Sequence, residues 1–426
     1  MSDFFRRYLL PGFVFESAVI AGGYATGREL VEFFLPAGPC GGVLGMIVSM
    51  LFWSAVLMVS FELARMAKAY DYRSFFKLLL GRAWFLYEIA YFALILIVFA
   101  VMGAAAGEIA HEMFGLPKLV GSMGMIAATG LMVFYSSTAI EKFLALSVGY
   151  LYLVYIVFFV WSLVAFGDRI EAAFASEPVG GGWFKAGVTY AGYNVGTIPA
   201  VLFCIRHLTR RREALVAGLL GGPLGMLPGV VFFIAMVGYQ DQIANVALPS
   251  AFLLGKLGAP WFAYAFQLAV LLTLVDTGVP ILHAINERVA KVYEERNRPM
   301  PRAMRPAIAI TVMVIAVYAA GAIGLINLIA NGYGYLTYAF IALLIVPVLT
   351  IGVWRITRPP GDPARPDDDG RSQPVSSSTR RGSGSCASRG LRPGTAGTRR
   401  RGRSSSACRR LAALRRAAHW CRSRRA

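Results

Sequence analysis

Residues 21–29 read AGGYATGRE, and they interrupt a stretch, 8–34, that has the length of a membrane-spanning helix. Three of the six residues from Gly22 to Gly27 are glycines. Each glycine weakens a helix by about 1 kcal/mol relative to alanine. The pattern therefore predicts a spanning helix that is broken near its middle.

A second interruption, GYNVGTIP at 192–199, lies inside the charge-free run 186–205. Pro199 removes a backbone donor and clashes with the preceding turn. Broken backbone at mid-membrane depth is tolerated only where it packs in protein or lines a cavity, and there its free peptide groups can hold a solute or a cation. Close helix packing through small residues explains either stretch alone, whereas two at matched positions favour a binding site.

The remaining body also has the composition of a membrane protein. The chain of 426 residues is 57% hydrophobic and 15% charged, against about a quarter charged in soluble domains. A span needs about 20 apolar residues. Uncharged runs of about that length or more occupy 43–61, 89–107, 119–140, 143–167, 186–205, 214–240, 257–275 and 306–354.

The last of these runs is too long for one crossing and is expected to divide near 327–335. With the stretch 8–34, the sequence predicts an all-α polytopic membrane protein of ten transmembrane helices, occupying 1–354. The tyrosines and other aromatic residues between 150 and 161 are interpreted as lipid-facing or packing residues.

The two halves of this body match each other. AGGY at 21–24 is similar to AGYN at 191–194, and GGVLGM at 41–46 is identical at five of six places to GGPLGM at 221–226. Both offsets correspond to five spans, an odd number, so the second half would enter from the opposite side of the membrane. The sequence thus predicts a 5+5 inverted repeat, with halves at about 8–167 and 185–354.

Charge separates the body from a tail. Residues 355–426 contain 19 arginines, no lysine and four aspartates, and subtracting these from the totals of 42 basic and 23 acidic residues leaves 23 and 19 in 1–354. The tail is rich in Pro, Gly, Ser and Arg and is expected to be disordered. It could bind anionic lipid or nucleic acid; a solvated extension is favoured, and no nucleic-acid partner is expected.

Loop charge predicts the orientation. With a cytoplasmic N-terminus, the inner segments hold 18 Lys and Arg residues and the outer segments hold four. The positive-inside rule then places both the N-terminus and the end of the body in the cytoplasm of a multi-pass protein in a bacterial-type inner membrane.

Ten spans in two inverted halves with broken first and sixth spans resemble the amino acid–polyamine–organocation superfamily, which includes the sodium-coupled neurotransmitter symporters. The wording AGGYATGRE after a short basic N-terminus is similar to the YkvI-like bacterial membrane proteins. The resemblance implies a solute held between the breaks of spans one and six, and a cation between spans one and eight. The solute-site positions carried over are Gly22, Gly23, Tyr24, Ala25, Thr26, Tyr193, Asn194, Gly196 and Thr197.

Charged residues within the apolar zone are costly and usually functional. Glu16 lies about 9 Å before Gly22 at helical rise, and Asp276 lies at a similar depth in the eighth span, flanked by Thr273 and Thr277. If those spans are neighbours, the oxygens suit a hard cation, and two close carboxylates also suit a proton carrier. Local capping or pairing near a helix end is the alternative. Arg28 and Glu29 are expected to neutralise each other, and Glu32 lies one turn beyond on the Arg28 side.

The function that these features predict is secondary transport of a small organic solute, such as an amino acid or amine, coupled to Na⁺ or H⁺ by alternating access. The sequence contains no HExxH, GxSxG, Walker A or GxGxxG motif, and its five cysteines lack metal-site spacing. An enzyme, a cofactor and a metal other than Na⁺ are therefore not expected. The alternative is a membrane receptor or assembly subunit that binds a solute without moving it.

Overall fold

The computed structural model describes residues 3–358 except Ala21, 133–136, Glu177, 296–300, 302–303 and Gly324. The predicted disordered tail lies outside the described residues from 359 onward, so that prediction and the boundary at 354 remain predictions.

Every regular element in the described part of the chain is a helix. The first half contains η1 (Phe5–Leu9), α1 (Leu10–Val19), α2 (Gly22–Ala25), α3 (Arg28–Phe34), η2 (Leu35–Ala37), α4 (Gly38–Ala67), α5 (Tyr72–Leu80), η3 (Gly81–Ala83), α6 (Trp84–Phe114), α7 (Lys118–Met132) and α8 (Ser137–Ser176). The second half contains α9 (Trp183–Asn194), η4 (Val195–Ala200), η5 (Leu202–His207), α10 (Arg211–Val237), α11 (Gln240–Ile243), α12 (Pro249–Leu257), α13 (Pro260–Glu295), α14 (Met304–Ile323), α15 (Leu325–Asn327), η6 (Leu328–Gly332), α16 (Tyr333–Phe340), η7 (Ile341–Ile345), η8 (Val348–Gly352) and α17 (Val353–Thr357).

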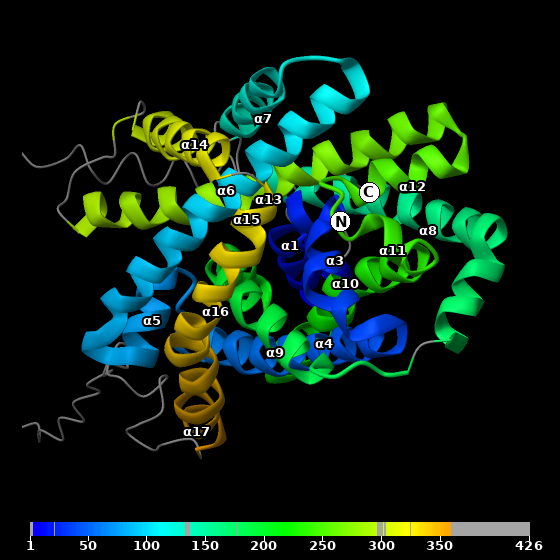
Figure 1. Ribbon diagram of the computed structural model, residues 1–426. Helices are drawn as coiled ribbons and strands as arrows, with labels where there is room; N and C mark the ends of the chain where they lie inside the picture. The colour runs from blue at the N-terminus through cyan, green and yellow to red at the C-terminus, as the bar shows by residue number, and fades with distance from the viewer. Residues whose placement is uncertain are drawn as a thin grey trace, which may run out of the picture. The chain divides into compact units, whose positions relative to one another are not determined.

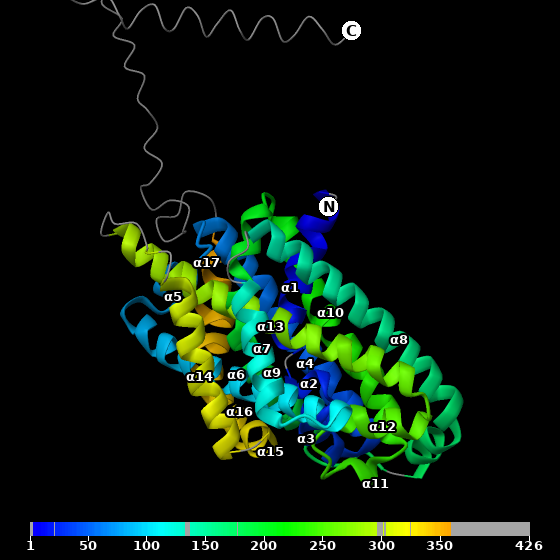
Figure 2. The ribbon, with the colours of Figure 1, turned by 90° about the horizontal axis from the view of Figure 1, so that it is seen from above.

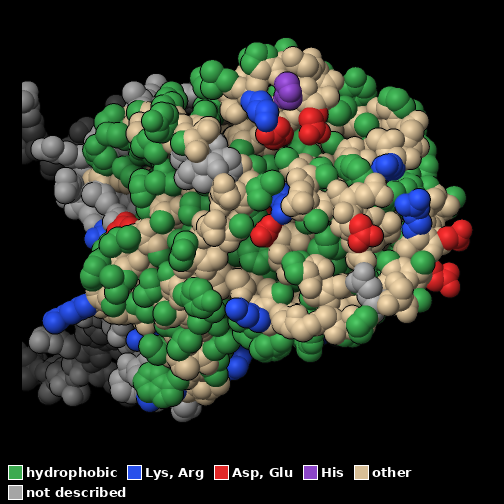
Figure 3. Space-filling view, viewed as in Figure 1, with side chains coloured by type: hydrophobic (Ala, Val, Ile, Leu, Met, Phe, Trp, Pro, Cys, Tyr) green, Lys and Arg blue, Asp and Glu red, His purple; other side chains and the backbone are tan. Residues whose placement is uncertain are grey.

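The helices have the length and surface of membrane spans. Among the described residues, six are long and apolar enough to cross a membrane: Arg28–Ala67, Tyr72–Phe114, Ala145–Ser176, Arg211–Val237, Pro260–Val279 and Leu325–Thr357. On the face shown in Figure 3, apolar side chains are widespread and charged ones are scattered. Apolar side chains on α8, such as Leu146 (74% exposed) and Val164 (82% exposed), point outward. Lipid would cover such a surface, and the predicted all-helical polytopic fold is confirmed.

Both predicted interruptions are present. In the first span, α1 ends at Val19 and Ile20 leaves the helical conformation. The short α2 follows, and Gly27 then takes a left-handed φ of 85° before α3 begins at Arg28. In the second interrupted span, α9 ends at Asn194 and the backbone continues as the 3-10 helices η4 and η5, with Pro199 inside η4.

The division of the run 306–354 near 327–335 remains a prediction, because Gly324 lies outside the described residues. Residues 327–335 are helical and include the π-helix η6. The glycine at 332 serves close packing, because a Cβ there would lie 3.3 Å from Ile97 on α6. Helix α5 was not predicted from the sequence; it begins where the Asp71 carboxylate accepts a hydrogen bond from the Ser74 N–H at 3.0 Å.

The broken first span occupies the centre of the bundle. Figure 1 shows α1 and α3 in dark blue among the other helices, with α10 beside them. Helix α1 packs against α10, α13 and α8, and α2 packs against α6 and α13. In Figure 2, α8 lies along one edge of the bundle and α14 and α16 lie along the opposite edge. The interruption at 20–27 is thus surrounded by helices.

Helices α4 and α10 make close contact at Gly218 and Gly222 of α10, the second of which belongs to the repeated glycine motif. A Cβ on Gly222 would lie 2.2 Å from Ser54 Oγ and 2.3 Å from the Met50 carbonyl oxygen, and one on Gly218 would lie 2.4 Å from the Met58 nitrogen. These neighbours include backbone atoms, which cannot move aside without shifting a whole helix. The two helices therefore touch backbone to backbone.

This contact predicts that Gly222→Ala lowers the free energy of unfolding by about 1–3 kcal/mol, because the added methyl group must force the helices apart. Gly149→Ala on α8 is the matched control: a Cβ there meets nothing within 4 Å, and alanine stabilises a helix by about 1 kcal/mol. Thermal unfolding of the two variants in detergent, followed by circular dichroism, checks this. Equal melting temperatures for the two variants would contradict the close packing.

Candidate functional site

The interrupted backbone is satisfied by hydroxyl groups from neighbouring helices. The Tyr155 hydroxyl of α8 donates to the Ala25 carbonyl at 3.0 Å, and the Tyr87 hydroxyl of α6 donates to the Gly196 carbonyl at 2.9 Å. Both tyrosines are buried. The interpretation of the 150–161 aromatic residues as lipid-facing or packing fits Tyr155, whose ring packs on Phe232 and Phe266. It did not include the bond of the hydroxyl to the break of the first span.

Most of the polar side chains predicted at the solute site bond to nearby backbone. Thr26 Oγ1 donates to the Gly23 carbonyl at 3.1 Å, Asn194 Nδ2 to the Tyr190 carbonyl at 3.0 Å and Thr197 Oγ1 to the Asn194 carbonyl at 2.7 Å. All three side chains are buried. These bonds stabilise the irregular segments themselves.

The Tyr24 side chain bonds to another helix, α10. Its hydroxyl donates to the Gly225 carbonyl of α10 at 2.9 Å. Gly22 and Gly23 both lie in α2, and a Cβ on Gly196 would lie 2.6 Å from the Phe340 ring. Because Gly23 and Gly196 lack a side chain, neighbouring side chains can pack directly on the backbone of the two breaks.

Glu29 joins the two interrupted spans, a role that was not predicted from the sequence. Its side chain is buried, and Oε2 accepts hydrogen bonds from the hydroxyls of Tyr193 at 2.6 Å and Tyr190 at 3.3 Å, both on α9. A Cβ on Gly23 would lie only 2.5 Å from Oε1. The carboxylate therefore touches the break of the first span and the last turn of α9.

Arg28 does not neutralise Glu29, so that expectation is wrong. The Arg28 guanidinium lies 2.6 Å from Glu32 Oε2 and donates to the Ala244 carbonyl at 2.6 Å. Positions 28 and 32 share one face of α3, whereas Glu29 faces α9. The position of Glu29 directly after the glycine-rich break indicates a site residue, but the expected pairing with Arg28 left Glu29 out of the predicted site.

Two further carboxyl groups lie where α1 packs against α13. Glu16 and Asp276 are both buried and close enough to interact electrostatically. Asp276 Oδ2 accepts a hydrogen bond from Ser147 Oγ at 2.5 Å. Within the described residues, neither Glu16 oxygen nor Asp276 Oδ1 has a hydrogen-bond partner. The condition that the first and eighth spans are neighbours is met.

Near this pair, the hydroxyl group of Thr277 lies close to three backbone carbonyl oxygens. Thr277 Oγ1 lies 2.6 Å from the Ser17 carbonyl oxygen, 2.9 Å from that of Ile20 and 2.8 Å from that of Thr273. One hydroxyl proton can satisfy only one of these three acceptors. Thr273 Oγ1 itself donates to the Ala269 carbonyl at 2.8 Å. We call Ser17, Ile20, Thr273 and Thr277 the Thr277 cluster; oxygen-rich groups of this kind suit a hard cation.

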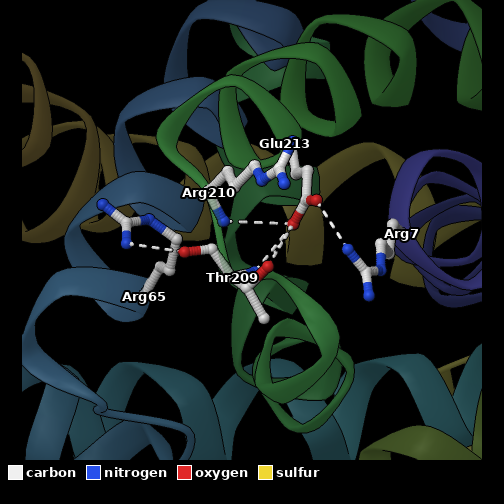
Figure 4. Close-up of polar contacts among 5 residues, drawn as sticks. All are labelled: Arg7, Arg65, Thr209, Arg210 and Glu213. Atoms are coloured by element: carbon white, nitrogen blue, oxygen red, sulfur yellow. Dashed lines mark hydrogen bonds and ion pairs between the residues drawn. The ribbon is translucent and has the colours of Figure 1, made fainter.

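A group of polar contacts, the Arg7 cluster, joins the N-terminal segment to α10 and α4 (Figure 4). Glu213 lies 2.9 Å from Arg7 Nη1 and also accepts from the N–H groups of Thr209 at 2.7 Å and Arg210 at 3.1 Å. Arg65 Nη1 donates to the Thr209 carbonyl at 3.3 Å. One carboxylate thus holds η1 and the start of α10 together.

The opposite end of the first span has its own contacts, which we call the Arg28 cluster: Arg28, Glu32 and the carbonyls of Ala244 and Val246. Beside it, the Ser250 N–H donates to the Thr26 carbonyl at 3.0 Å. A pocket of 490 Å³ lies between α6, α12 and α13 and includes Val246 in its lining. None of the residues of the two breaks or of the Thr277 cluster lines it, so it is separate from the site at the breaks.

Comparison with known proteins supports the fold. No family model matches the chain. Over 219 residues it is 26% identical to the uncharacterized membrane protein YkvI of Bacillus subtilis (strain 168), a region that covers 50% of this chain and 61% of that protein. The chain thus matches about three-fifths of the length of this relative. The expected distant similarity to YkvI is confirmed.

Two solved structures share the fold at low sequence identity. The crystal structure of MhsT in complex with L-phenylalanine matches with a TM-score of 0.55 and 16% identity, covering 81% of this chain and 96% of MhsT. The crystal structure of a mutant of the Eremococcus coleocola manganese transporter matches with a TM-score of 0.54 and 15% identity, covering 80% of this chain and 78% of that one. The chain is a multi-pass membrane protein with a transporter-like fold.

The Arg7 cluster predicts how the N-terminal segment is held. Arg7→Ala should accelerate amide hydrogen exchange in residues 5–10 about two- to fivefold, because a partly exposed ion pair adds only modestly to the local stability of the segment that it holds. Arg212→Ala, an exposed position on the first turn of α10, is the control and should leave exchange unchanged. Exchange measured by mass spectrometry decides, and an equal rate in both variants would show that Arg7 does not hold this segment.

Proposed function

We propose that this protein is a secondary active transporter that binds a small organic solute, an amino acid, amine or related compound, between the breaks of its first and sixth spans. The observation that carries the proposal is that two interrupted spans face each other in the buried centre of a transporter-like fold. Interrupted helices inside a membrane protein leave peptide groups available to a solute. The residues proposed to surround the solute are Gly22, Gly23, Tyr24, Ala25, Thr26, Tyr193, Asn194, Gly196 and Thr197.

Glu16, Asp276 and the Thr277 cluster are proposed to couple transport to Na⁺ or H⁺. A buried carboxylate without a counter-charge is costly, so it must acquire a cation or a proton. Glu16 has no hydrogen-bond partner among the described residues, and the carbonyls of Ser17 and Ile20 end α1 directly beside Thr277. A cation bound here would fix the end of α1, next to the break where the solute sits. Ion binding and solute binding would then stabilise the same conformation.

Alternating access requires contacts at each end of the pathway that can break in turn. The Arg7 cluster and the Arg28 cluster are such contacts, since each ties the broken first span to the second half of the chain by a few polar interactions. Opening either cluster would release one half of the first span while the other half stays packed. The predicted orientation makes the Arg7 cluster cytoplasmic and places both the N-terminus and the end of the body inside.

The finer architecture belongs to the same proposal: ten spans in a 5+5 inverted repeat within a bacterial-type inner membrane. The two copies of the glycine motif support it, because they lie in α4 and α10, which pack against each other. The competing function is a receptor or assembly subunit, since a fold does not by itself fix a function. A receptor would bind its solute without a coupling ion and would not move it.

The test is a screen of the purified full chain by thermal unfolding against amino acids, amines and small acids. Each compound is added in sodium, in potassium and at two pH values. A solute at 100 times its dissociation constant stabilises the folded state by about 2.7 kcal/mol. We expect a shift that depends on sodium or on pH, followed by uptake into proteoliposomes driven by the same ion. Binding that ignores ion and pH, without uptake, would establish the receptor instead.

The coupling site predicts that Asp276→Asn abolishes the ion or pH dependence of solute binding, and that Thr277→Val weakens ion binding about tenfold, because one oxygen ligand is lost. Thr350→Val is the matched control, since its exposed hydroxyl bonds only within its own helix to the Val346 carbonyl. Uptake measured against ion concentration checks both. Unchanged ion dependence in Asp276→Asn would remove this aspartate from the coupling mechanism.

A further inference from the structure

Glu29 is a buried carboxylate with one occupied oxygen and one empty oxygen. Oε2 receives the hydroxyls of Tyr193 and Tyr190 at 2.6 and 3.3 Å. Oε1 has no hydrogen-bond partner among the residues described, although the side chain is buried. The adjacent cation, Arg28, is committed to Glu32 and to backbone carbonyls. The charge of Glu29 therefore has no partner of opposite sign in its hydrogen-bonding shell.

Aromatic rings surround this carboxylate. Tyr193 stacks on Tyr333 with ring centroids 4.3 Å apart and planes 5° apart, and it meets Tyr190 edge-on at 5.5 Å. Phe33, one turn after Glu29 on α3, contacts the rings of Tyr190 and Tyr193 at 5.4 and 5.7 Å. Tyr333 is fully buried, interacts electrostatically with Glu29, and its hydroxyl has no partner within the described part of the chain. We call Glu29, Tyr190, Tyr193 and Tyr333 the Glu29 cluster.

The chemistry of this cluster differs from that of the Thr277 cluster. A hard metal cation prefers six or more oxygen ligands, among them carbonyls, and the Thr277 cluster supplies several carbonyls around one point. The Glu29 cluster instead combines one carboxylate with aromatic rings and phenol hydroxyls. That combination recognises an ammonium group, which donates charge-assisted hydrogen bonds to a carboxylate and is attracted to aromatic faces.

The position of the cluster relates it to the solute. Glu29 touches Gly23 in the break of the first span, and its tyrosine partners are on α9, directly before the sixth span becomes irregular. Resting on the proposed transport function, we propose that the solute carries a protonated amine and that the Glu29 cluster binds its ammonium group through the free Glu29 oxygen. Glu29 thereby sets the charge specificity of the solute site.

The test compares matched amines and alcohols on the full chain in detergent at fixed sodium concentration and pH. Ethylamine, benzylamine and phenethylamine are each paired with the alcohol of the same skeleton. We expect at least one amine to raise the melting temperature in a saturable way while its alcohol does not. This comparison uses the unaltered chain and does not depend on any variant folding.

Two variants assign the effect to the cluster. Glu29→Gln should weaken binding of that amine by about 30-fold or more, the usual cost of removing one partner of a buried charge pair. Glu171→Gln, an exposed carboxylate on α8 outside the named clusters, is the control and should change the affinity less than about threefold. If Glu29→Gln does not fold, Tyr193→Phe serves instead and should weaken binding about five- to tenfold through loss of its bond to Glu29.

The outcomes separate this inference from the transport function. Ion-dependent binding of neutral or acidic solutes, with no amine preferred over its alcohol, would overturn the amine inference and leave transport standing. Amine binding that Glu29→Gln does not weaken would also overturn the amine inference. So would stabilisation by sodium or potassium without any amine, if that stabilisation is lost in Glu29→Gln. Absence of binding and uptake for every class of solute would overturn both proposals.

Discussion

Peptide groups at the two breaks must find hydrogen-bond partners without water, and much of the interior follows from this requirement. In a continuous helix each carbonyl is satisfied by its own chain, whereas the ends of α1, α2 and α9 leave carbonyls free. Tyr155 and Tyr87 supply hydroxyls from α8 and α6, and Thr277 supplies one from α13. These side chains explain why the surrounding helices must pack closely against the broken spans.

The interior therefore holds two chemically distinct polar regions on either side of the first break. On the α1 side, Glu16, Asp276 and the Thr277 cluster gather carbonyl and carboxyl oxygens. On the α3 side, Glu29 gathers phenol hydroxyls and aromatic rings. The short α2 separates them by little more than one helical turn. A change in the position of α2 would be felt at both regions, which gives a physical route for coupling between an ion and a solute.

The sequence predicted the helical class and the two breaks, because glycine and proline leave strong local signals. That the spans carrying Glu16 and Asp276 are neighbours was a condition of the coupling-site prediction, and only the family resemblance implied it. Prediction from the sequence failed where the answer depended on which side chains face each other. Arg28 was paired with its neighbour Glu29, although helical geometry turns positions 28 and 29 to different faces. Tyr155 packs on Phe232 and Phe266 in agreement with its interpretation as a packing residue, but a tyrosine in an apolar run has no local sign that its hydroxyl bonds a distant carbonyl.

The contact between α4 and α10 has a mechanical consequence. Gly218 and Gly222 bring backbone atoms of the two helices so close that even a methyl group has no room. Helices in such contact cannot slide past each other or rotate separately without steric clashes, so they should move as one rigid body. The first span is attached to this rigid body through Tyr24, whose hydroxyl donates a hydrogen bond to the Gly225 carbonyl of α10. Rearrangements of the bundle should therefore be hinge-like motions in which α4 and α10 keep their positions relative to each other.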